Sequence, residues 1–254
     1  MIDLHFHALP GLDDGPATTD DALALCAAAA ADGTVIAVAT PHISFEYPEI
    51  DAATVQAGVR TLRAELRRAG IALDLRAGGE VALTRAIELP DEELRALTLG
   101  ESSTVLLELP WHATGSGMAA AVARVADRGF QVLIAHPERT PLLRDDPDLV
   151  RGLVESGACC CINAASLSGR AARRTTAAAR HLLAEGLVHA IVSDAHDTVG
   201  RRPAVRSILA TAGFSRAELT YFTEEGPRAL LEGASPGPPP LVGRPRARLP
   251  WRRA

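Results

Sequence analysis

The chain has 254 residues, 47% of them hydrophobic, which is enough to bury the core of one barrel-sized domain or of two smaller ones. Its formal net charge is -5, and because residues 234–254 hold five arginines and no acids, the rest of the chain stands near -10. A body this acidic argues against a nucleic-acid-binding surface.

The sequence predicts neither a membrane span nor a secretory signal. The apolar stretch over residues 23–39 is interrupted by Asp32 and Gly33, and the N-terminus has no basic region before an apolar run. Four cysteines, three of them consecutive, do not make a disulfide framework in a chain of this length. We therefore expect a cytoplasmic, reducing location.

Seven short apolar runs recur along the chain and are predicted to be strands: MIDLH, VIAVAT, LDLRAG, TVLLEL, QVLIAH, CCCINA and AIVSDAH. Stretches with helical periodicity lie between them, at residues 20–31, 51–69, 118–128, 147–156 and 173–185. Several of these begin at capping residues and several end at glycine. Seven such units fit before Pro203, which favours an α/β protein with a distorted (β/α)7 TIM-like barrel over an open doubly wound sheet.

Two regions are expected on this basis. Residues 1–233 form the barrel domain, and residues 234–254 are too rich in proline and arginine to bury enough apolar surface to order themselves. We expect this tail to be disordered, with its arginines solvated and too few to act as a membrane anchor alone.

Histidines and carboxylates fall at or just beyond the C-terminal ends of the predicted strands. They are His5, His7, His42, Glu80, Glu108, His136, Asp194 and His196. Parallel barrels assemble their active sites on this face. A single strand-end histidine is more often a hydrogen-bonded loop residue, but so many on one face favour a metal centre.

The ligand types narrow the choice of metal. Imidazoles with carboxylates and no thiolate suit zinc, manganese or iron(II). The candidates are too many for one ion, so we expect two or three ions with a carboxylate such as Glu80 bridging a pair. Ions about 3.5 to 4 Å apart can hold a hydroxide between them and stabilise both the attacking and the leaving oxygen of an in-line displacement. The site therefore predicts phosphate ester hydrolysis.

Phosphate recognition also needs fixed positive charge near the metals. Arg139 lies three residues after His136, while Arg201 and Arg202 follow His196 closely. Arginine presents a bidentate fork to phosphate oxygens. The alternative is that these are ordinary surface arginines of an arginine-rich chain.

The motifs DLHFHALPGLDDGP, ATPH, GGE, LLELP, AHPER, INAASL and SDAHD follow one another across about residues 2–203. Together they resemble the PHP (polymerase and histidinol phosphatase) superfamily, and within it the bacterial capsular-polysaccharide type of manganese-dependent protein-tyrosine phosphatase. The DDGP and AHPER motifs separate this subgroup from PHP nucleases and histidinol phosphatases.

The resemblance implies a PHP-fold barrel holding two or three divalent ions, manganese first, with iron or zinc as alternatives. Carried over by position, the three ion sites would be His5, His7, Glu80 and Asp194; Glu80, Glu108 and His136; and Asp14, His42 and His196. Arg139 and Arg201 match the phosphate-binding arginines. The family's Arg-Pro-Pro here reads Arg201-Arg202-Pro203, so either arginine of the pair can fill that place.

The expected mechanism is direct attack of a metal-bridging hydroxide on phosphorus, without a phosphoenzyme. A tyrosine phenol, with a pKa near 10, leaves readily, and either Asp197 or a metal-bound water can supply a proton. The implied substrate is phosphotyrosine in a bacterial tyrosine autokinase of capsule or exopolysaccharide synthesis. The alternatives are a small-molecule phosphatase of the histidinol-phosphate kind and a catalytically silent module that binds the kinase. The oligomeric state is left open.

Several other residues of reactive types are expected to have structural roles. A cysteine-dependent phosphatase needs Cys and Arg six positions apart, and none of the four cysteines has Arg at that offset. The triplet at residues 159–161 is expected to be apolar packing in the sixth strand. His181 and His189 lie off the strand-end pattern and are expected to be structural. Trp111 and His112 follow Glu108. His112 can line the substrate mouth but is more often an ordinary loop residue, and Trp111 can either stack on an aromatic substrate or anchor the loop.

Overall fold

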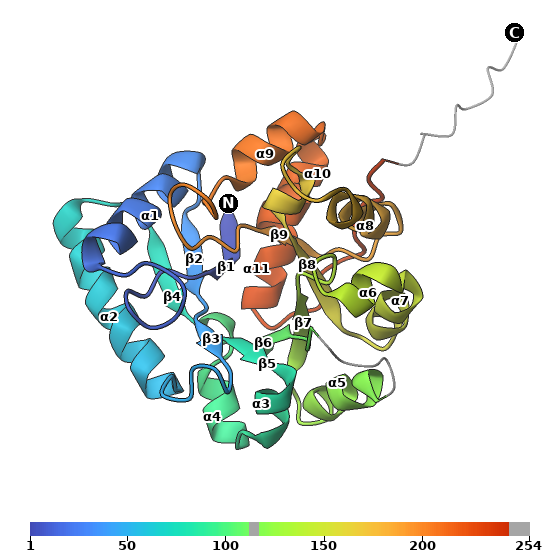
Figure 1. The fold of residues 1–254 in the computed structure, drawn as a ribbon, viewed down its shortest axis with the longest axis horizontal. Coiled ribbons are helices and arrows are strands. Elements are labelled where there is room, and N and C mark those ends of the chain that lie inside the picture. The colour runs from blue at the N-terminus through green and yellow to red at the C-terminus, as the bar shows by residue number, and fades with distance from the viewer. Residues whose placement is uncertain (112–116, 244–254) are drawn as a thin grey trace, which may run out of the picture.

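The computed structural model describes residues 1–111 and 117–243, in which helices surround a set of parallel strands (Figure 1). The strands are β1 Ile2–Phe6, β2 Ile36–Ala39, β3 His42–Ile43, β4 Asp74–Ala77, β5 Glu80–Ala82, β6 Thr104–Glu108, β7 Gln131–Ala135, β8 Cys159–Asn163 and β9 Ala190–Val192. All seven predicted strand positions are confirmed, and the second and third are each divided into two segments.

Two parallel sheets are formed, with the orders β1-β2-β4 and β3-β5-β6-β7-β8-β9. An isolated parallel bridge between Phe6 and Ala195 joins the end of β1 to the segment that follows β9. Spatial neighbours therefore follow chain order from the first strand to the last, as in a (β/α)7 barrel. The hydrogen-bond ladder is not a closed ring, because it is interrupted inside the second and third strands.

The interruptions have local causes. Pro41 separates β2 from β3 and has no N–H to donate to a ladder. Gly78 and Gly79 separate β4 from β5, and a Cβ at either would come within 2.8 Å of the Val38 or Ile43 side chain. After these interruptions β3 pairs with β5, so that His42 and Glu80 become register partners at the C-terminal edge.

The five predicted helices are confirmed within a few residues of their expected bounds: α1 Thr19–Asp32, α2 Ala52–Ala69, α5 Met118–Ala126, α7 Pro147–Glu155 and α8 Arg173–Ala184. Thr18 and Asp21 form a capping box at the start of α1, and Gly33 ends that helix at φ 103°.

The described residues hold nine further helical segments, most of them short: α3 Leu83–Glu88, α4 Asp91–Ala96, η1 Leu99–Glu101, α6 Pro141–Asp145, η2 Ala164–Leu167, α9 Val205–Ala212, α10 Arg216–Thr220, the π-helical η3 Tyr221–Glu225 and α11 Gly226–Leu231.

The core has two layers because strand side chains alternate in direction. One layer lies between the strands and the surrounding helices and includes Val105, Ile134 and Cys160. The other fills the inside of the strand ring together with η1 and α11. Its buried members are Ile2, Leu4, Val38, Leu99, Leu106, Leu133, Ala135, Cys159, Cys161, Ala190, Val192, Leu230 and Leu231. The cysteine triplet thus packs on both faces of β8, as predicted, and its thiols are free and buried.

The segment after α11 runs along the body of the protein as far as residue 243. The Tyr221 hydroxyl donates to the Gly237 carbonyl at 2.5 Å, and Val242 N–H donates to the Leu183 carbonyl at 3.2 Å. A disordered tail from residue 234 stays a prediction, and residues 244–254, with the five tail arginines, lie outside the described part. Among the described helices, none combines the length and the apolar character needed to cross a bilayer.

Candidate metal centre

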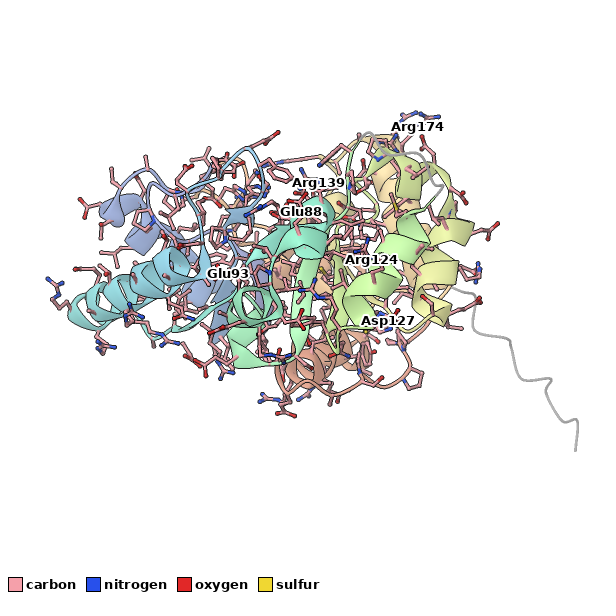
Figure 2. The ribbon with its side chains drawn as sticks, turned by 90° about the horizontal axis from the view of Figure 1, so that it is seen from below. Glu88, Glu93, Arg124, Asp127, Arg139 and Arg174 are labelled. Carbon is pink, nitrogen blue, oxygen red and sulfur yellow. The ribbon has the colours of Figure 1, made fainter. Side chains whose placement is uncertain are left out.

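The predicted site residues lie on the face where the strands end. In Figure 2, Arg174, which follows β8, lies at the upper edge, Arg139, which follows β7, lies below it in the upper part, and Asp127, which precedes β7, lies lower than both. The strand-end histidines and carboxylates therefore meet at one side of the barrel. The structure brings all nine candidate ligands into one connected cluster: His5, His7, Asp14, His42, Glu80, Glu108, His136, Asp194 and His196.

Glu80 is at the centre of this cluster. Its Oε2 lies 3.2 Å from His5 Nε2, 3.4 Å from His7 Nε2 and 3.0 Å from His42 Nδ1. Its Oε1 lies 2.8 Å from His136 Nε2. A carboxylate with two oxygens facing different imidazoles suits a bridge between cations.

Asp194 and Asp14 extend the cluster to either side. Asp194 Oδ1 lies 3.5 Å from His5 Nε2 and 3.6 Å from His7 Nε2. Asp14 Oδ1 lies 3.0 Å from His196 Nε2 and 3.4 Å from His42 Nε2. The Glu80 side chain is 1% exposed and that of Asp14 45%, so the cluster is buried at one end and open to solvent at the other.

Three sets of donor atoms in the described residues converge closely enough to share an ion. They are His7, Asp14, His42 and His196; His5, His7 and Glu80; and His42, Glu80 and Glu108. His136 joins through its contact with Glu80. The assignment of each residue to a particular ion stays a prediction.

The hydrogen bonding fits a cation better than a simple ion-pair network. Glu80 Oε2 is buried and has three imidazole nitrogens within 3.4 Å, yet it makes no hydrogen bond with good geometry. His196 Nε2 is likewise buried and without a hydrogen bond. Buried polar atoms are nearly always hydrogen-bonded, so an unpaired oxygen among convergent nitrogens indicates a shared metal ligand.

The local charges also favour a cation. Burial lowers the pKa of His7, but the neighbouring carboxylates of Asp13 and Glu80 outweigh it and raise that pKa to about 9. Burial likewise opposes protonation of His42, yet Asp14 and Glu80 raise its pKa to about 11. These two imidazoles therefore sit in a strongly negative field, which divalent cations would neutralise.

Two members of the cluster have unusual backbones. His136 has φ 32° and Asp194 has φ 51°, the left-handed region that residues with a side chain rarely adopt. Such conformations cost about 1 to 3 kcal/mol each and occur mainly where a site requires a particular side-chain direction. Here they accompany side chains that face the cluster, His136 toward Glu80 and Asp194 toward His5 and His7.

Residues that the sequence analysis did not single out support the cluster. Asp13 Oδ2 lies 2.7 Å from His7 Nδ1 and also accepts the His42 backbone N–H at 3.1 Å. Asn163 Nδ2 donates to Asp194 Oδ2 at 2.6 Å. Buried Glu138 accepts from the Asn163 N–H and the Ser166 hydroxyl, which fixes the end of β8. The only signal for Asp13 was its place beside Asp14 in the turn.

Two arginines lie against the cluster. Arg139 donates to Asp194 Oδ2 at 2.5 Å, and Arg201 donates to Asp194 Oδ1 at 2.9 Å and to Asp14 Oδ2 at 3.0 Å. Arg202 lines a neighbouring cavity, whereas Arg201 hydrogen-bonds two candidate ligands, so among the described contacts Arg201 is the arginine of this pair that touches the cluster.

The Asp197 carboxylate accepts backbone N–H groups of its own loop. Its exposed carboxylate accepts the backbone N–H groups of Val199 at 2.6 Å and of Arg201 at 3.2 Å. Burial raises the pKa of Asp197, but the backbone hydrogen bonds outweigh this effect, so the pKa of the carboxyl group is lowered. The side chain shapes the loop, and a role in proton transfer stays a prediction.

The remaining histidines are placed as follows. His181 is exposed on α8, and buried His189 accepts the Cys160 N–H through Nδ1 at 3.1 Å. His112 lies outside the described residues.

A cavity of about 420 Å³ opens over the cluster. Trp111 and Phe45 lie on its wall, with 41% and 58% of their surfaces exposed. Trp111 donates from Nε1 to Glu108 Oε1 at 3.1 Å, and the Arg139 guanidinium lies 5.9 Å from the centre of the Trp111 ring. The opening therefore combines aromatic surface with positive charge.

The fold and site together define a parallel α/β barrel-type protein with a multi-residue histidine and carboxylate centre at the C-terminal ends of its strands. Residues 1–216 match the family described as "Capsular polysaccharide synthesis, CpsB/CapC". The chain belongs to this family, which confirms the resemblance found in the sequence.

Named relatives agree with this membership. Tyrosine-protein phosphatase YwqE of Bacillus subtilis (strain 168) is 29% identical over 232 residues, or 91% of each chain. Tyrosine-protein phosphatase CpsB of Streptococcus pneumoniae is 29% identical over 211 residues, covering 80% of this chain and 86% of CpsB.

Solved structures show the same fold. A crystal structure from work on YwqE of Bacillus subtilis and CpsB of Streptococcus pneumoniae, described as unique metal-dependent tyrosine phosphatases, superposes with a TM-score of 0.83. It is 27% identical and covers 96% of this chain and 100% of that chain. Dihydropyrimidinase from Brevibacillus agri NCHU1002, with 14% identity and a TM-score of 0.57, covers 95% of this chain and 73% of its own. That second likeness concerns the fold alone.

Proposed function

We propose that this protein is a metal-dependent phosphomonoester hydrolase that removes phosphate from phosphotyrosine in proteins. The observation that carries the proposal is the Glu80 carboxylate, buried among three imidazole nitrogens without a hydrogen bond on Oε2, beside Arg139 and Arg201. The names of the relatives YwqE and CpsB, both tyrosine-protein phosphatases, support the same activity.

The cluster holds two or three divalent cations in this proposal, manganese first and iron or zinc as alternatives. Its ligands are the nine histidine and carboxylate residues of the cluster, with Glu80 shared. When bound, such ions withdraw electrons from phosphoryl oxygens and lower the pKa of water, which is the chemistry that phosphate ester hydrolysis needs.

The protein's own residues bind and orient the phosphoryl group. Arg139 and Arg201 approach the cluster from two loops, and their guanidinium groups can bind phosphoryl oxygens and balance the charge that develops on them. Trp111 and Phe45 provide exposed aromatic surface for the tyrosine ring at the mouth of the cavity.

A covalent phosphocysteine has no support in this site. All four cysteines are buried, and burial raises the pKa of the Cys159 thiol to about 11 and that of Cys26 to about 12. In this proposal water attacks phosphorus directly and the tyrosine phenolate leaves in the same displacement. Because a phenol has a pKa near 10, the leaving tyrosine needs less help from an acid than an alkyl alcohol does.

The proposed substrate is phosphotyrosine of a bacterial tyrosine autokinase in capsule or exopolysaccharide synthesis, in the cytoplasm. The description of the family, capsular polysaccharide synthesis, supports this setting.

The test measures phosphate release from a phosphotyrosine peptide and from histidinol phosphate, with the metal content of the same samples. Wild-type protein supplied with manganese is expected to hydrolyse the peptide in preference to histidinol phosphate and to lose activity with a chelator. His136→Ala is expected to lose metal and turnover, whereas the control His181→Ala, in an exposed residue on α8, behaves as wild type. Retained metal and unimpaired turnover in His136→Ala would contradict the proposal, and preference for histidinol phosphate would favour the small-molecule alternative.

A further inference from the structure

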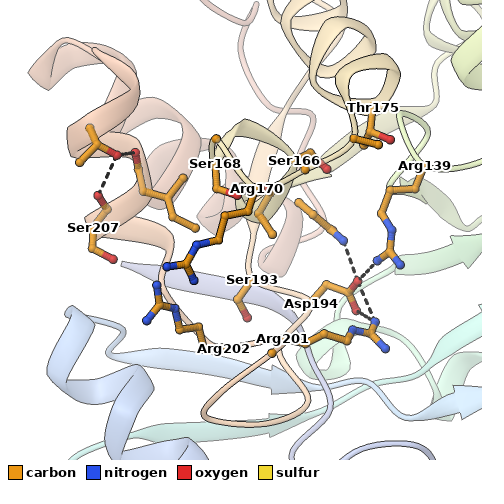
Figure 3. Close-up of a pocket in the computed structure, with 18 of the residues that line it drawn as sticks. Arg139, Ser166, Ser168, Arg170, Thr175, Ser193, Asp194, Arg201, Arg202 and Ser207 are labelled. Carbon is orange, nitrogen blue, oxygen red and sulfur yellow. Dashed lines mark hydrogen bonds and ion pairs between the residues drawn. The ribbon is translucent and has the colours of Figure 1, made fainter.

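A second, larger cavity extends away from the metal centre. It has a volume of about 730 Å³, within the range of roughly 300 to 1,000 Å³ typical of sites that enclose a drug-sized ligand. Asp194, Arg139 and Arg201 form the end that touches the cluster. The other end is formed by the loop before α8 and by the β9–α9 loop with α9, as Figure 3 shows for Arg170, Arg202 and Ser207. The cavity is larger than a single phosphorylated phenol requires.

The wall of this cavity is strongly positive. Among its described lining residues, five are arginines and one is an acid: Arg139, Arg144, Arg170, Arg201, Arg202 and Asp194. The whole chain carries a net charge of -5. A concave positive wall on an acidic protein concentrates its field on whatever enters, and so selects an anion.

Two of these arginines have no carboxylate partner. Arg139 and Arg201 are paired with Asp194, and Arg144 with Asp145, but in residues 1–111 and 117–243 no acid lies within ion-pair distance of Arg170 or Arg202. Both side chains are exposed and reach the same cavity from different loops. Like charges on the wall of one cavity repel, and an anion bound between them would offset that repulsion.

The hydroxyl groups on the wall contribute less. Ser168, Ser207 and Thr211 donate to backbone carbonyls of their own segments, so their protons are engaged. The guanidinium groups are therefore the main donors offered to a ligand, and they suit carboxylate or phosphoryl oxygens.

We propose that Arg170 and Arg202 form a subsite for a second anionic group of the substrate polypeptide, bound while the phosphotyrosine under attack lies at Arg139 and Arg201. This inference rests on the proposed phosphatase function and adds a preference among its substrates. The second group is either the carboxylate of a nearby Asp or Glu or the phosphoryl group of a second phosphotyrosine. The subsite acts on binding, because neither arginine contacts the candidate metal ligands in the described structure.

The test compares three peptides of equal length, in which one phosphotyrosine is flanked by neutral residues, by acidic residues or by a second phosphotyrosine. Each is assayed with the metal-loaded wild type, with Arg170→Gln/Arg202→Gln, and with the control Arg216→Gln, an exposed arginine on α10 outside this cavity. Binding is measured in parallel by fluorescence anisotropy of the same peptides carrying a non-hydrolysable phosphonate.

The wild type and Arg216→Gln are expected to prefer the anionic peptides about tenfold in KM, and to lose this preference as salt is raised. The double variant should lose the preference while keeping its kcat on the neutral peptide and on p-nitrophenyl phosphate. If both anionic peptides have a lower KM than the neutral peptide, the subsite binds carboxylates and phosphoryl groups alike. If only the doubly phosphorylated peptide has a lower KM, the subsite binds phosphoryl groups.

Active wild type that treats the three peptides alike, or a double variant that keeps the preference, would overturn the subsite and leave the phosphatase function intact. A wild type without phosphatase activity would refute the proposed function. In that case the anisotropy measurement still tests the subsite. Tighter binding of the anionic peptides that is lost in the double variant supports the subsite, and equal binding of all three peptides overturns it.

Discussion

Replacement of Asp13 by asparagine tests whether this carboxylate orients a metal ligand. Asp13 lies 2.7 Å from His7 Nδ1, and its oxygens also accept the backbone N–H groups of His42 and Gly15. Burial raises the pKa of Asp13, but the bond to His7 outweighs it, so the carboxylate is ionised and holds the proton of His7 on Nδ1. Nε2 of His7 faces Glu80, and its electron pair binds a metal once the cation displaces the proton that the raised pKa keeps on the ring.

The expected loss of metal affinity depends on the orientation that the introduced amide adopts. If the amide oxygen of the Asp13→Asn variant faces His7, the negative charge is lost and the Gly15 N–H loses its acceptor, but the bond to His7 Nδ1 remains, and metal affinity should fall about tenfold. If the amide NH₂ faces Nδ1 instead, the proton of His7 moves to Nε2, and the loss should approach a hundredfold, or about 2.7 kcal/mol.

The assay is competition for manganese between the protein and a fluorescent chelator, followed by activity at saturating metal. Asp20→Asn is the control, because Asp20 is an exposed acid at the start of α1. An Asp13→Asn protein that binds manganese within twofold of wild type would refute the orienting role.

Three further predictions concern other parts of the molecule. Arg139→Gln should lower kcat/KM for phosphotyrosine peptide about a hundredfold without loss of metal, as steady-state kinetics with metal analysis would show, because a charged donor to the phosphoryl group is removed. Glu138→Ala should lower the free energy of unfolding by about 2 to 4 kcal/mol in urea melts, since it leaves the buried Asn163 N–H and Ser166 hydroxyl without their acceptor; an unchanged midpoint would count against it. Burial lowers the pKa of His189 from 6.5 to about 4, so as the pH falls the unfolded chain takes up this proton before the folded protein does. The free energy of unfolding should therefore fall by about 3 kcal/mol between pH 6.5 and pH 4. His189→Asn should lack this loss in metal-free urea melts at both pH values, and equal pH dependence in the two proteins would contradict the assignment.

The order of the strands and the main helices could be predicted because each is a local property of the chain. Apolar runs of strand length alternate with helical periodicity, and caps such as Thr18 and Gly33 mark the ends. The division of the second and third strands could not be predicted in this way. It depends on Gly78 and Gly79 fitting against Val38 and Ile43, which are distant in sequence and meet only in the folded barrel.

The same distinction holds for the site. The candidate ligands could be found because parallel strands bring their C-terminal ends to one face, so that position along each strand is sufficient. Supporting residues such as Asp13 and Asn163 follow no such pattern, since their partners are set by side-chain packing. The choice between Arg201 and Arg202 likewise depends on the path of one loop, in which Asp197 accepts backbone N–H groups.

The most direct test of the account is anomalous diffraction from crystals of the protein grown with manganese. We expect at least two anomalous peaks within the cluster, with Glu80 contacting two of the ions and His136 contacting one. An absence of anomalous density among His5, His7 and Glu80, or a single ion with Glu80 unbound, would contradict the claim that these strand-end residues share several cations.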